Sequence, residues 1–203
     1  MTDRITTTAE LEALYGKAAG ASLAKETPVI NAEYRTLIEA APFMTIATLG
    51  AGGMDCSPRG DGVGFVKILD ERTIAIADRR GNNRLDTLRN IVEEPRVGLL
   101  FLIPGWNECL RINGKAHITT EPELLESFTV NGKPPVTAIV INIDTIYFQC
   151  ARAIKRAKLW DMESQVEASE LPKAGQLVQS VMAEFEGEMY DAALQERQAK
   201  TLY

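Results

Sequence analysis

The chain has 203 residues, with 22 basic and 28 acidic side chains, a formal net charge of −6 and one histidine. Its 45% hydrophobic and 25% charged residues are typical of a globular protein, and the length suits one domain with appendages. The acidic balance argues against a nucleic-acid-binding module, which needs a basic surface. The single histidine, His117, excludes a histidine-rich zinc site within one chain and confines any Ser/His/Asp triad to that position.

The three cysteines are dispersed and form no C-x-x-C motif. Such a set indicates reduced thiols, and we expect Cys109 and Cys150 to be buried packing residues. The N-terminus has no apolar signal-like region, and the longest apolar runs are far too short to span a membrane. These observations predict a cytoplasmic protein with no membrane contact.

Residues 1–41 are predicted to form a helical segment. Thr7 and Glu10 have the spacing of a capping box, Asn31 can cap a second helix, and Pro42 ends it. Residues 42–162 are instead rich in Val, Ile, Thr and Phe at strand-like spacing, which favours a small antiparallel barrel over βαβ units. The strands are expected over 43–49, 54–58, 64–69, 73–77, 96–102, 110–119 and 137–150, interrupted by helices over 84–93 and 121–128.

The last part of the chain, residues 163–203, is predicted to hold one long amphipathic helix over 174–199. Its apolar stripe requires a partner surface. We expect it to pack on the barrel or to extend a dimer interface.

The most informative motif is the run from Asp78 to Arg84, Asp-Arg-Arg-Gly-Asn-Asn-Arg, between a predicted strand and a predicted helix. Such a junction places free backbone N–H groups, the positive end of the helix dipole and arginine side chains next to one another, with Asn83 as the N-cap. This combination suits a phosphate group. The alternative is a surface turn with solvated arginines, and the pattern alone leaves both open.

A second motif is Ser-Pro-Arg-Gly-Asp-Gly-Val-Gly-Phe over residues 57–65. Its glycines do not match the dinucleotide fingerprint, and no strand–helix unit follows them. Glycines in a strand-rich region mark a bulge or a backbone approached by a planar ligand. Arg59 and Asp61 would point the same way from a strand, and spacing alone favours a local pair between them.

A third cluster, from Arg152 to Trp160, has four basic residues before the first acid. It could bind an anionic ligand, with Trp160 covering an aromatic ring. The alternative is a solvated basic turn in which Trp160 packs in the core or at an interface. His117 falls on the polar face of a strand together with Arg111, where an exposed side chain is favoured over a catalytic base. These clusters favour binding of a phosphorylated planar ligand, so in an enzyme a cofactor would carry the reactivity.

Several runs, taken in this order, resemble the pyridoxamine 5′-phosphate oxidase-like family of FMN-binding flavoproteins, in an oxidase-related branch of undetermined substrate. The resemblance covers about residues 30–162. The runs are Ser57-Pro-Arg-Gly-Asp61, Asp78-Arg-Arg-Gly-Asn-Asn-Arg-Leu-Asp86, Pro95-Arg-Val-Gly-Leu-Leu-Phe101, Leu110-Arg-Ile-Asn-Gly-Lys-Ala116 and Cys150-Ala-Arg-Ala-Ile-Lys-Arg-Ala-Lys-Leu-Trp160.

The resemblance implies a mainly β fold with flanking helices, namely a homodimeric split β-barrel with FMN at the subunit interface. It implies a strand beside the flavin ring at 59–61, a strand end near the ring or ribityl chain at 77–78, and phosphate contacts at 80–84. Position 111 and the segment around 156–160 would reach the cofactor near the dimer interface. The cofactor-binding residues implied are Arg59, Gly60, Asp61, Ala77, Asp78, Arg80, Asn83, Arg84, Arg111, Arg156 and Trp160.

The expected function is that of an FMN-dependent oxidoreductase acting on an unidentified small substrate, with Arg59 and Arg111 as candidates to act on it. Enzymes that oxidise pyridoxamine phosphate end in a basic, Trp-containing segment, whereas residues 184–196 are acidic here. The resemblance therefore supports FMN binding but not the oxidation of pyridoxamine phosphate. The alternatives are a flavin carrier or redox sensor without turnover, and a relative that binds haem through His117 or a deazaflavin.

Overall fold

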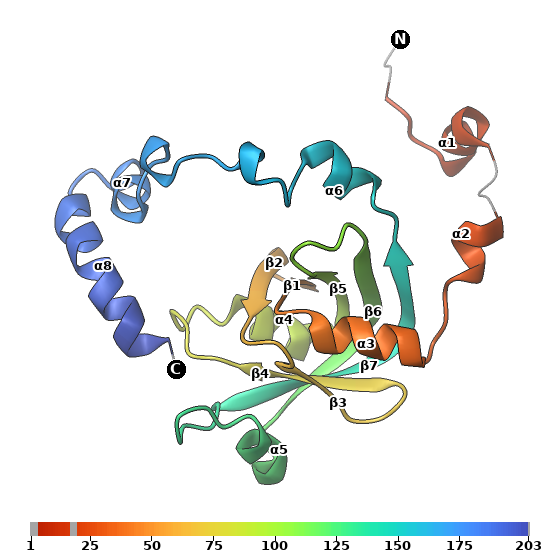
Figure 1. Cartoon of the computed structure of the whole chain (residues 1–203), viewed down its shortest axis with the longest axis horizontal. Helices are drawn as coiled ribbons and strands as arrows, with labels where there is room; N and C mark the ends of the chain where they lie inside the picture. Colours follow the sequence, from red (N-terminus) through yellow and green to blue (C-terminus); the bar gives the residue numbers. More distant parts are fainter. Residues whose placement is uncertain (1–3, 17–19, 203) are drawn as a thin grey trace.

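The computed structural model describes residues 4–16 and 20–202. Its centre is one antiparallel sheet, strongly curved, with helices around it (Figure 1). The order of the strands in the sheet is β2-β1-β5-β6-β7-β4-β3. The strands are β1 (Phe43–Gly50), β2 (Gly53–Gly60), β3 (Val66–Ile68), β4 (Thr73–Asp78), β5 (Arg96–Leu102), β6 (Cys109–Thr119) and β7 (Thr137–Gln149).

The sheet is not closed by hydrogen bonds. Its two edges are β2 and β3, and among the described residues these strands do not pair with each other. The expectation of a mainly β fold with flanking helices is confirmed, and the expected strands all form, although β3 is shorter than predicted. The chain thus forms an open, curved sheet with a gap between its two edge strands, β2 and β3.

Alternating side chains fill the inside of this curved sheet. Along β6, Ile112 and Ala116 are buried while Asn113, Lys115 and His117 are exposed, as the alternation in the sequence predicted. The core is dominated by branched aliphatic side chains from β1, β4, β5, β6 and β7, namely Ile46, Ile74, Ile76, Leu99, Ile112, Ile139, Ile141 and Ile146. These residues make the sheet rigid enough to position side chains at its rim.

One glycine is required by the sheet itself. The pairing of β6 with β7 shifts its register between Asn113 and Gly114, which marks a β-bulge. A Cβ atom at Gly114 would lie 2.2 Å from the carbonyl oxygen of Asn142. Any side chain at this position would therefore push the two strands apart.

The N-terminal helices are α1 (Thr8–Tyr15), α2 (Gly20–Ala24) and α3 (Ala32–Ala40). The predicted capping box of Thr7 and Glu10 is confirmed, as is the cap of α3, where the Asn31 side chain accepts a hydrogen bond from the Tyr34 N–H at 2.8 Å. Tyr34 and Ile38 bury their side chains against the sheet, and the backbone of Thr27 bridges to Ile146 of β7. The bridge at Thr27 and the buried face of α3 therefore fix this part of the chain to the sheet.

The helix after the basic turn differs from its prediction. Helix α4 spans Asp86–Glu93, two residues later than expected, and Asn83 is not its N-cap. Asn83 instead has φ 59°, and Leu85, with φ 62°, occupies the cap position without a side-chain cap. These two residues in the left-handed region, which non-glycine residues seldom adopt, end the turn before the helix.

The other short helices are α5 (Pro122–Ser127) and α6 (Arg152–Ala157), followed by 3-10 turns at Met162–Ser164 and Ala168–Glu170. No helix of the described residues is long and apolar enough to cross a membrane.

The expected single helix over 174–199 is wrong. The segment forms two helices, α7 (Ala174–Gln179) and α8 (Gly187–Thr201), which pack against each other as a hairpin set apart from the sheet (Figure 1). The contact depends on two glycines, because a Cβ atom at Gly175 would lie 2.1 Å from the Gly187 carbonyl oxygen. The apolar side chains expected to form a packed stripe are largely exposed, among them Leu177, Val181, Met182 and Met189.

Candidate functional site

A polar pocket of about 580 Å³ lies between the ends of β2 and β4, the basic turn after β4 and the start of α4. Because β2 is one edge of the sheet and β4 adjoins the other, the pocket spans the gap in the sheet, which we call the seam. Its volume is in the range of small-molecule sites, roughly 300–1,000 Å³. The lining residues are Asp55, Ser57, Pro58, Arg59, Gly60, Asp61, Phe65, Ala77, Asp78, Arg79, Arg80, Gly81, Asn82, Asn83, Arg84, Leu85, Asp86, Thr87 and Leu88.

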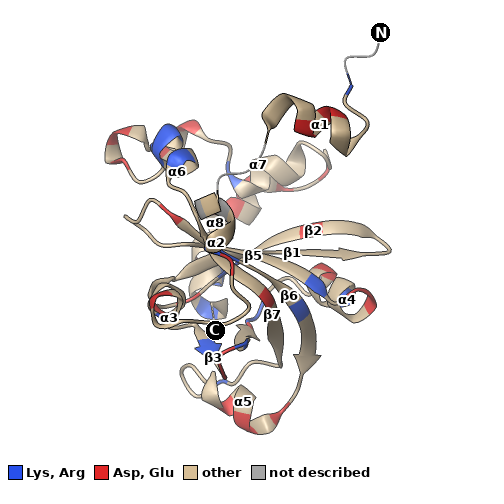
Figure 2. Cartoon of the chain, turned by 90° about the vertical axis from the view of Figure 1, so that its right-hand side faces the viewer, with Lys and Arg blue, Asp and Glu red and all other residues tan. Residues whose placement is uncertain are grey.

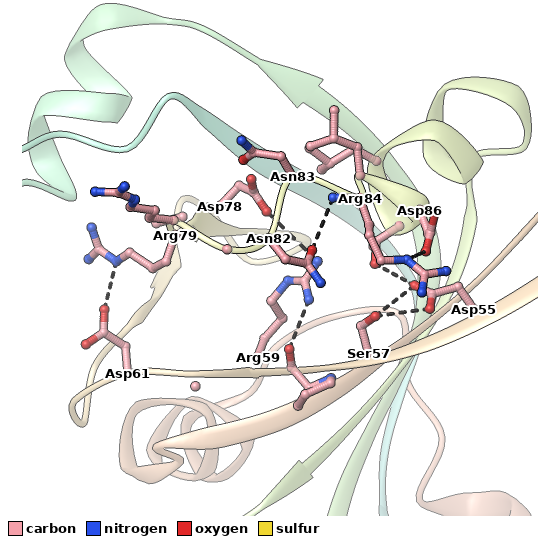
Figure 3. A pocket seen from close by; sticks show the side chains of 18 of the residues that line it. Asp55, Ser57, Arg59, Asp61, Asp78, Arg79, Asn82, Asn83, Arg84 and Asp86 are labelled. Atoms are coloured by element: carbon pink, nitrogen blue, oxygen red, sulfur yellow. Dashed lines mark hydrogen bonds and ion pairs between the residues drawn. The ribbon is translucent and has the colours of Figure 1, made fainter. Parts of the chain in front are cut away.

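Side chains, and not backbone bonds, join the two sides of the seam (Figure 3). Arg59 of β2 lies 3.9 Å from the carboxylate of Asp78 at the end of β4. The Nε of Arg79 donates to Asp61 at 2.9 Å, and its Nη1 donates to the carbonyl oxygen of Phe128 at 2.8 Å. Arg59 and Asp61 were predicted to pair with each other. Instead, each forms an ion pair with a residue on the other side of the seam.

A hydroxyl-carboxylate cluster holds the β2 side against α4. The buried Thr87 hydroxyl donates to Asp55 at 2.6 Å, and the Ser57 hydroxyl donates to the same carboxylate at 2.9 Å. Asp55, Ser57 and Arg59 alternate along β2 and so project from the same face of the strand. Asp55 and Thr87 were not predicted as site residues, although the period of two along β2 is a signal that points to Asp55.

Arg59 and Asp78 have the most constrained environments in the pocket. The Nε atom of Arg59 is buried and has no hydrogen-bond partner in the described chain. Burial raises the pKa of Asp78 above its usual value, and the Arg59 charge opposes that shift. A buried donor without a partner costs free energy, so a ligand that accepts a hydrogen bond from Arg59 Nε would relieve that cost.

The basic turn presents several free donors at the other end of the pocket. The Asn82 side chain accepts a hydrogen bond from the Arg84 N–H at 3.1 Å, which fixes the turn. The Nε of Arg84 donates to Asp86 at 2.8 Å, leaving its Nη groups unbonded. Arg80 is exposed and makes no hydrogen bond or ion pair within the described residues. Together with the uncapped first turn of α4, these groups can bind an anion.

The structure brings most of the predicted site residues together. Those lining the pocket are Arg59, Gly60, Asp61, Ala77, Asp78, Arg80, Asn83 and Arg84. The remaining three lie elsewhere on this chain. Arg111 stands over the ring of Tyr147 at 5.2 Å, Arg156 is on the exposed surface of α6, and the Trp160 indole donates to the Trp106 carbonyl oxygen at 2.7 Å. Figure 2 shows the basic residues of α6 well apart from α4, so in a single chain they do not contribute to this pocket.

Other chemically active side chains lie outside the pocket. His117 is exposed on β6, and Cys150 is exposed, which corrects the expectation that it is a buried packing residue. Cys109 is buried as expected. Within residues 4–16 and 20–202, no group of three or more His, Cys, Asp and Glu side chains is placed to hold a metal ion.

Solved structures with a similar fold come from several bacteria. HupZ of Group A Streptococcus is 20% identical, with a TM-score of 0.48, and the match covers 59% of this chain and 93% of that one. General Stress Protein 26 of Bacillus anthracis is 18% identical with a TM-score of 0.45, over 57% and 89% of the two chains. A Clostridium acetobutylicum protein related to general stress protein 26 is 13% identical with a TM-score of 0.42, over 57% and 84%.

No curated protein matches the sequence. The sequence profile of the family described as Pyridoxamine 5'-phosphate oxidase, however, matches residues 30–150, which is more than half of the chain. The matched region includes every strand of the sheet and every residue that lines the pocket. The chain therefore belongs to the pyridoxamine 5′-phosphate oxidase family.

Proposed function

We propose that the chain binds FMN in the seam pocket and is an FMN-dependent oxidoreductase acting on a small substrate. The observation that carries the proposal is the pocket's donor set. It joins a basic turn and an uncapped helix start at one end to an edge strand with a buried, unpartnered arginine Nε at the other. This arrangement suits a long ligand with a phosphate at one end and hydrogen-bond acceptors on a flat ring at the other.

The residues of the pocket fit the two ends of FMN in different ways. Arg80, Asn83 and Arg84 would hold the phosphate, since Arg80 and the Nη groups of Arg84 have no other partner in the described chain. The outer edge of β2 has no strand beside it, so a flat ring could lie along this edge with residues 59–61 next to it. Ala77 and Asp78, at the end of β4, would lie near the ring or the ribityl chain.

Three predicted contacts would come from a second subunit. Arg111, Arg156 and Trp160 do not line the pocket of their own chain. We propose a homodimer in which they reach the cofactor of the partner. The pocket is also open on one side to solvent, as expected for a site completed by another chain, since four of its lining residues at 80–83 are exposed.

Bound FMN would supply the capacity to accept and pass on electrons, which none of these side chains has. The chain's own residues would bind the cofactor and the substrate and orient them. Arg59 would donate to an acceptor on the ring or substrate, and Asp78 would keep Arg59 in place from the opposite side of the seam. Substrate would meet a site with balanced charge, because the lining has four arginines (Arg59, Arg79, Arg80, Arg84) and four aspartates (Asp55, Asp61, Asp78, Asp86).

The experiment is to purify the full chain, record its absorption spectrum before and after adding FMN, and identify any released cofactor by mass. A flavin spectrum with FMN released supports the proposal. A colourless protein that shows no perturbed flavin spectrum after FMN addition contradicts it, and release of a deazaflavin or haem would replace FMN by that cofactor.

Turnover needs a separate measurement, since a spectrum does not distinguish an enzyme from a flavin carrier or redox sensor. Stopped-flow mixing of the FMN-loaded protein with NADH or NADPH, followed by air, would follow reduction and reoxidation. Reduction and reoxidation within seconds supports an oxidoreductase. Binding without reduction by either donor or by a panel of small organic reductants would support a carrier.

A further inference from the structure

Three buried polar side-chain atoms of the described residues have no hydrogen-bond partner. They are the Nε of Arg59 and the hydroxyl oxygens of Thr129 and Thr137. Two of the three flank Asp78, the last residue of β4: Arg59 lies across the seam from it, and Thr137 is its partner in the pairing with β7. Most buried polar atoms in folded proteins are paired, so two unpaired ones beside a single carboxylate indicate a function.

Thr137 and Asp78 project from the same face of the sheet. They stand directly opposite each other in the antiparallel pairing of β4 with β7, and the next pair on that face is Ile76 with Ile139. Both isoleucines are fully buried in the core that fills the curved sheet. Because the Cβ atoms of directly opposite residues lie about 4.5–5.5 Å apart, a hydroxyl and a carboxylate at these positions can reach each other by side-chain rotation.

The Asp78 carboxylate has no hydrogen-bond donor within the described chain. Its ion pair there is with Arg59, whose Nη2 lies 3.9 Å away, too far for a hydrogen bond (Figure 3). The Asp78 side chain is 23% exposed, so solvent can still hydrate the carboxylate. A ligand that fills the pocket would remove this water, because Asp78 lines the pocket. The carboxylate would then need a donor from the protein, since a buried charge without hydrogen bonds is costly.

Thr137 offers the donor that this carboxylate lacks. Its hydroxyl is buried on the same face and has no acceptor of its own, so donating to Asp78 breaks no existing bond. Arg59 has the matching deficiency on the ligand side. Its Nη1 donates to the Pro58 carbonyl oxygen at 2.9 Å, while its Nε has no acceptor. A ligand atom that accepts from this Nε would leave all three groups paired.

We propose that Thr137 is a positioning residue for the cofactor, an inference that rests on the proposed binding of FMN in the seam pocket. In the loaded protein, the Thr137 hydroxyl donates to the Asp78 carboxylate. The carboxylate, held in this way, keeps the Arg59 guanidinium in place, and the Nε of Arg59 donates to the cofactor. Thr137 does not line the pocket, so it acts through Asp78 and Arg59.

The test compares the free and the FMN-loaded chain of Thr137→Val, which replaces the hydroxyl by a methyl group. Because the hydroxyl has no partner in the free chain, we expect urea denaturation without FMN to give an unchanged or higher free energy of unfolding. FMN binding, measured by fluorescence titration, should be about tenfold weaker, as expected for the loss of a hydrogen bond to a charged group. Thr137→Ser keeps the hydroxyl and should retain most of the affinity.

Thr129→Val is the matched control. It also removes a buried hydroxyl without a partner, but Thr129 neither lines the pocket nor pairs with Asp78, so FMN affinity should not change. A double-mutant cycle with Asp78→Asn tests how the effect is transmitted. Thr137→Val should weaken FMN binding less in that background, because residue 78 then carries no charge.

The inference is overturned by equal FMN affinity of the wild type and Thr137→Val, by an equal loss in Thr129→Val, or by the absence of coupling in the cycle. It is also overturned if Thr137→Val is less stable without FMN or does not fold, since the free chain would then need the hydroxyl. If the wild type binds FMN in any of these cases, the proposed function stands. If the wild type binds no FMN, both fail.

Discussion

Arg84 is the residue on which the proposed phosphate site depends most. Its Nη groups have no partner in the described chain, and its backbone N–H is fixed by the Asn82 side chain. A phosphate held by Arg84 would form charge-assisted hydrogen bonds, which are stronger than neutral ones.

Replacing Arg84 by alanine is expected to weaken FMN binding by roughly 1.5–3 kcal/mol, or about 10- to 150-fold in Kd. Fluorescence titration of FMN would measure it. Arg89→Ala is the matched control, because Arg89 is an exposed arginine on the helix that follows the turn but does not line the pocket. Equal FMN affinity for the wild type and Arg84→Ala would show that Arg84 is an ordinary surface residue.

Asp78 gives a prediction about pH. Burial raises its pKa in the folded state above the ordinary 3.8, with Arg59 opposing the shift. The folded protein therefore holds this proton more tightly than the unfolded chain, so the contribution of Asp78 to stability is greatest below the ordinary pKa. It is lost as the pH rises through the raised value.

Asp78→Asn should remove that dependence. The free energy of unfolding of the wild type, relative to the variant, is expected to fall as the pH rises from about 3.8 towards neutral. Urea unfolding of both proteins across this range measures the difference. A constant difference over the whole range would show that Asp78 titrates at the same pH in the folded and unfolded chains.

At the scale of elements, Gly114 tests whether the bulge positions the sheet. Gly114→Ala would bring a Cβ atom to 2.2 Å from a backbone oxygen of β7, and backbone cannot move aside as a flexible side chain can. We expect a loss of roughly 1–3 kcal/mol in the free energy of unfolding, measured by chemical denaturation.

Gly98→Ala on the adjacent strand is the control for that measurement. A Cβ atom there would lie 3.6 Å from the nearest atom, the Asn113 side-chain oxygen, which is an ordinary contact. The two variants share the change in unfolded-chain entropy, so their difference reports the clash. Similar stabilities for both would mean that the strands adjust around residue 114 without cost.

The strands were predictable because the local pattern of side chains determines them. Alternating branched side chains specify a strand and its buried face, and β5 was predicted with its observed bounds, Arg96–Leu102. The start of α4 was not predictable, because Asn83 and Leu85 take left-handed conformations that non-glycine residues seldom adopt. The packing of α7 against α8 through Gly175 and Gly187 is likewise not visible in a local pattern.

The pocket was only partly predictable for a similar reason. Motifs near residues 59–61 and 77–84 were visible in the sequence, and the structure places both at the pocket. The bond from Thr87 to Asp55 joins residues 32 apart, and nothing local links them. The exposure of Cys150 depends on where β7 ends and α6 begins, which a strand pattern does not fix.

For the whole molecule, the seam predicts how ligand binding and stability are coupled. Side-chain pairs such as Arg59–Asp78 and Arg79–Asp61 join its two sides, and each is partly exposed to solvent. A ligand in the pocket would contact both sides at once. At a concentration of about 100 times its Kd it would add roughly 2.7 kcal/mol to the free energy of unfolding.

Hydrogen exchange followed by mass spectrometry would locate that effect. Saturating FMN is expected to slow exchange in β2 and in the turn from 79 to 85 more than in β6 and β7, whose backbone is already paired on both sides. Arg84→Ala is the control and should show less protection at the same FMN concentration. An absence of protection in β2 and in the turn, with protection confined to another part of the chain, would place the ligand elsewhere.

Strand β2 is a potential site of aggregation, since an unpaired edge can form hydrogen bonds with a strand from another molecule. Pro58 stands within β2, opposite Thr45 of β1, and has no N–H to offer to an added strand. Asp55 and Arg59 place charges on the same strand. An incoming chain would therefore lose a ladder bond and bury charge, whereas a small molecule needs only the groups that remain. The edge can stay available to a ligand while it resists fibril-like association.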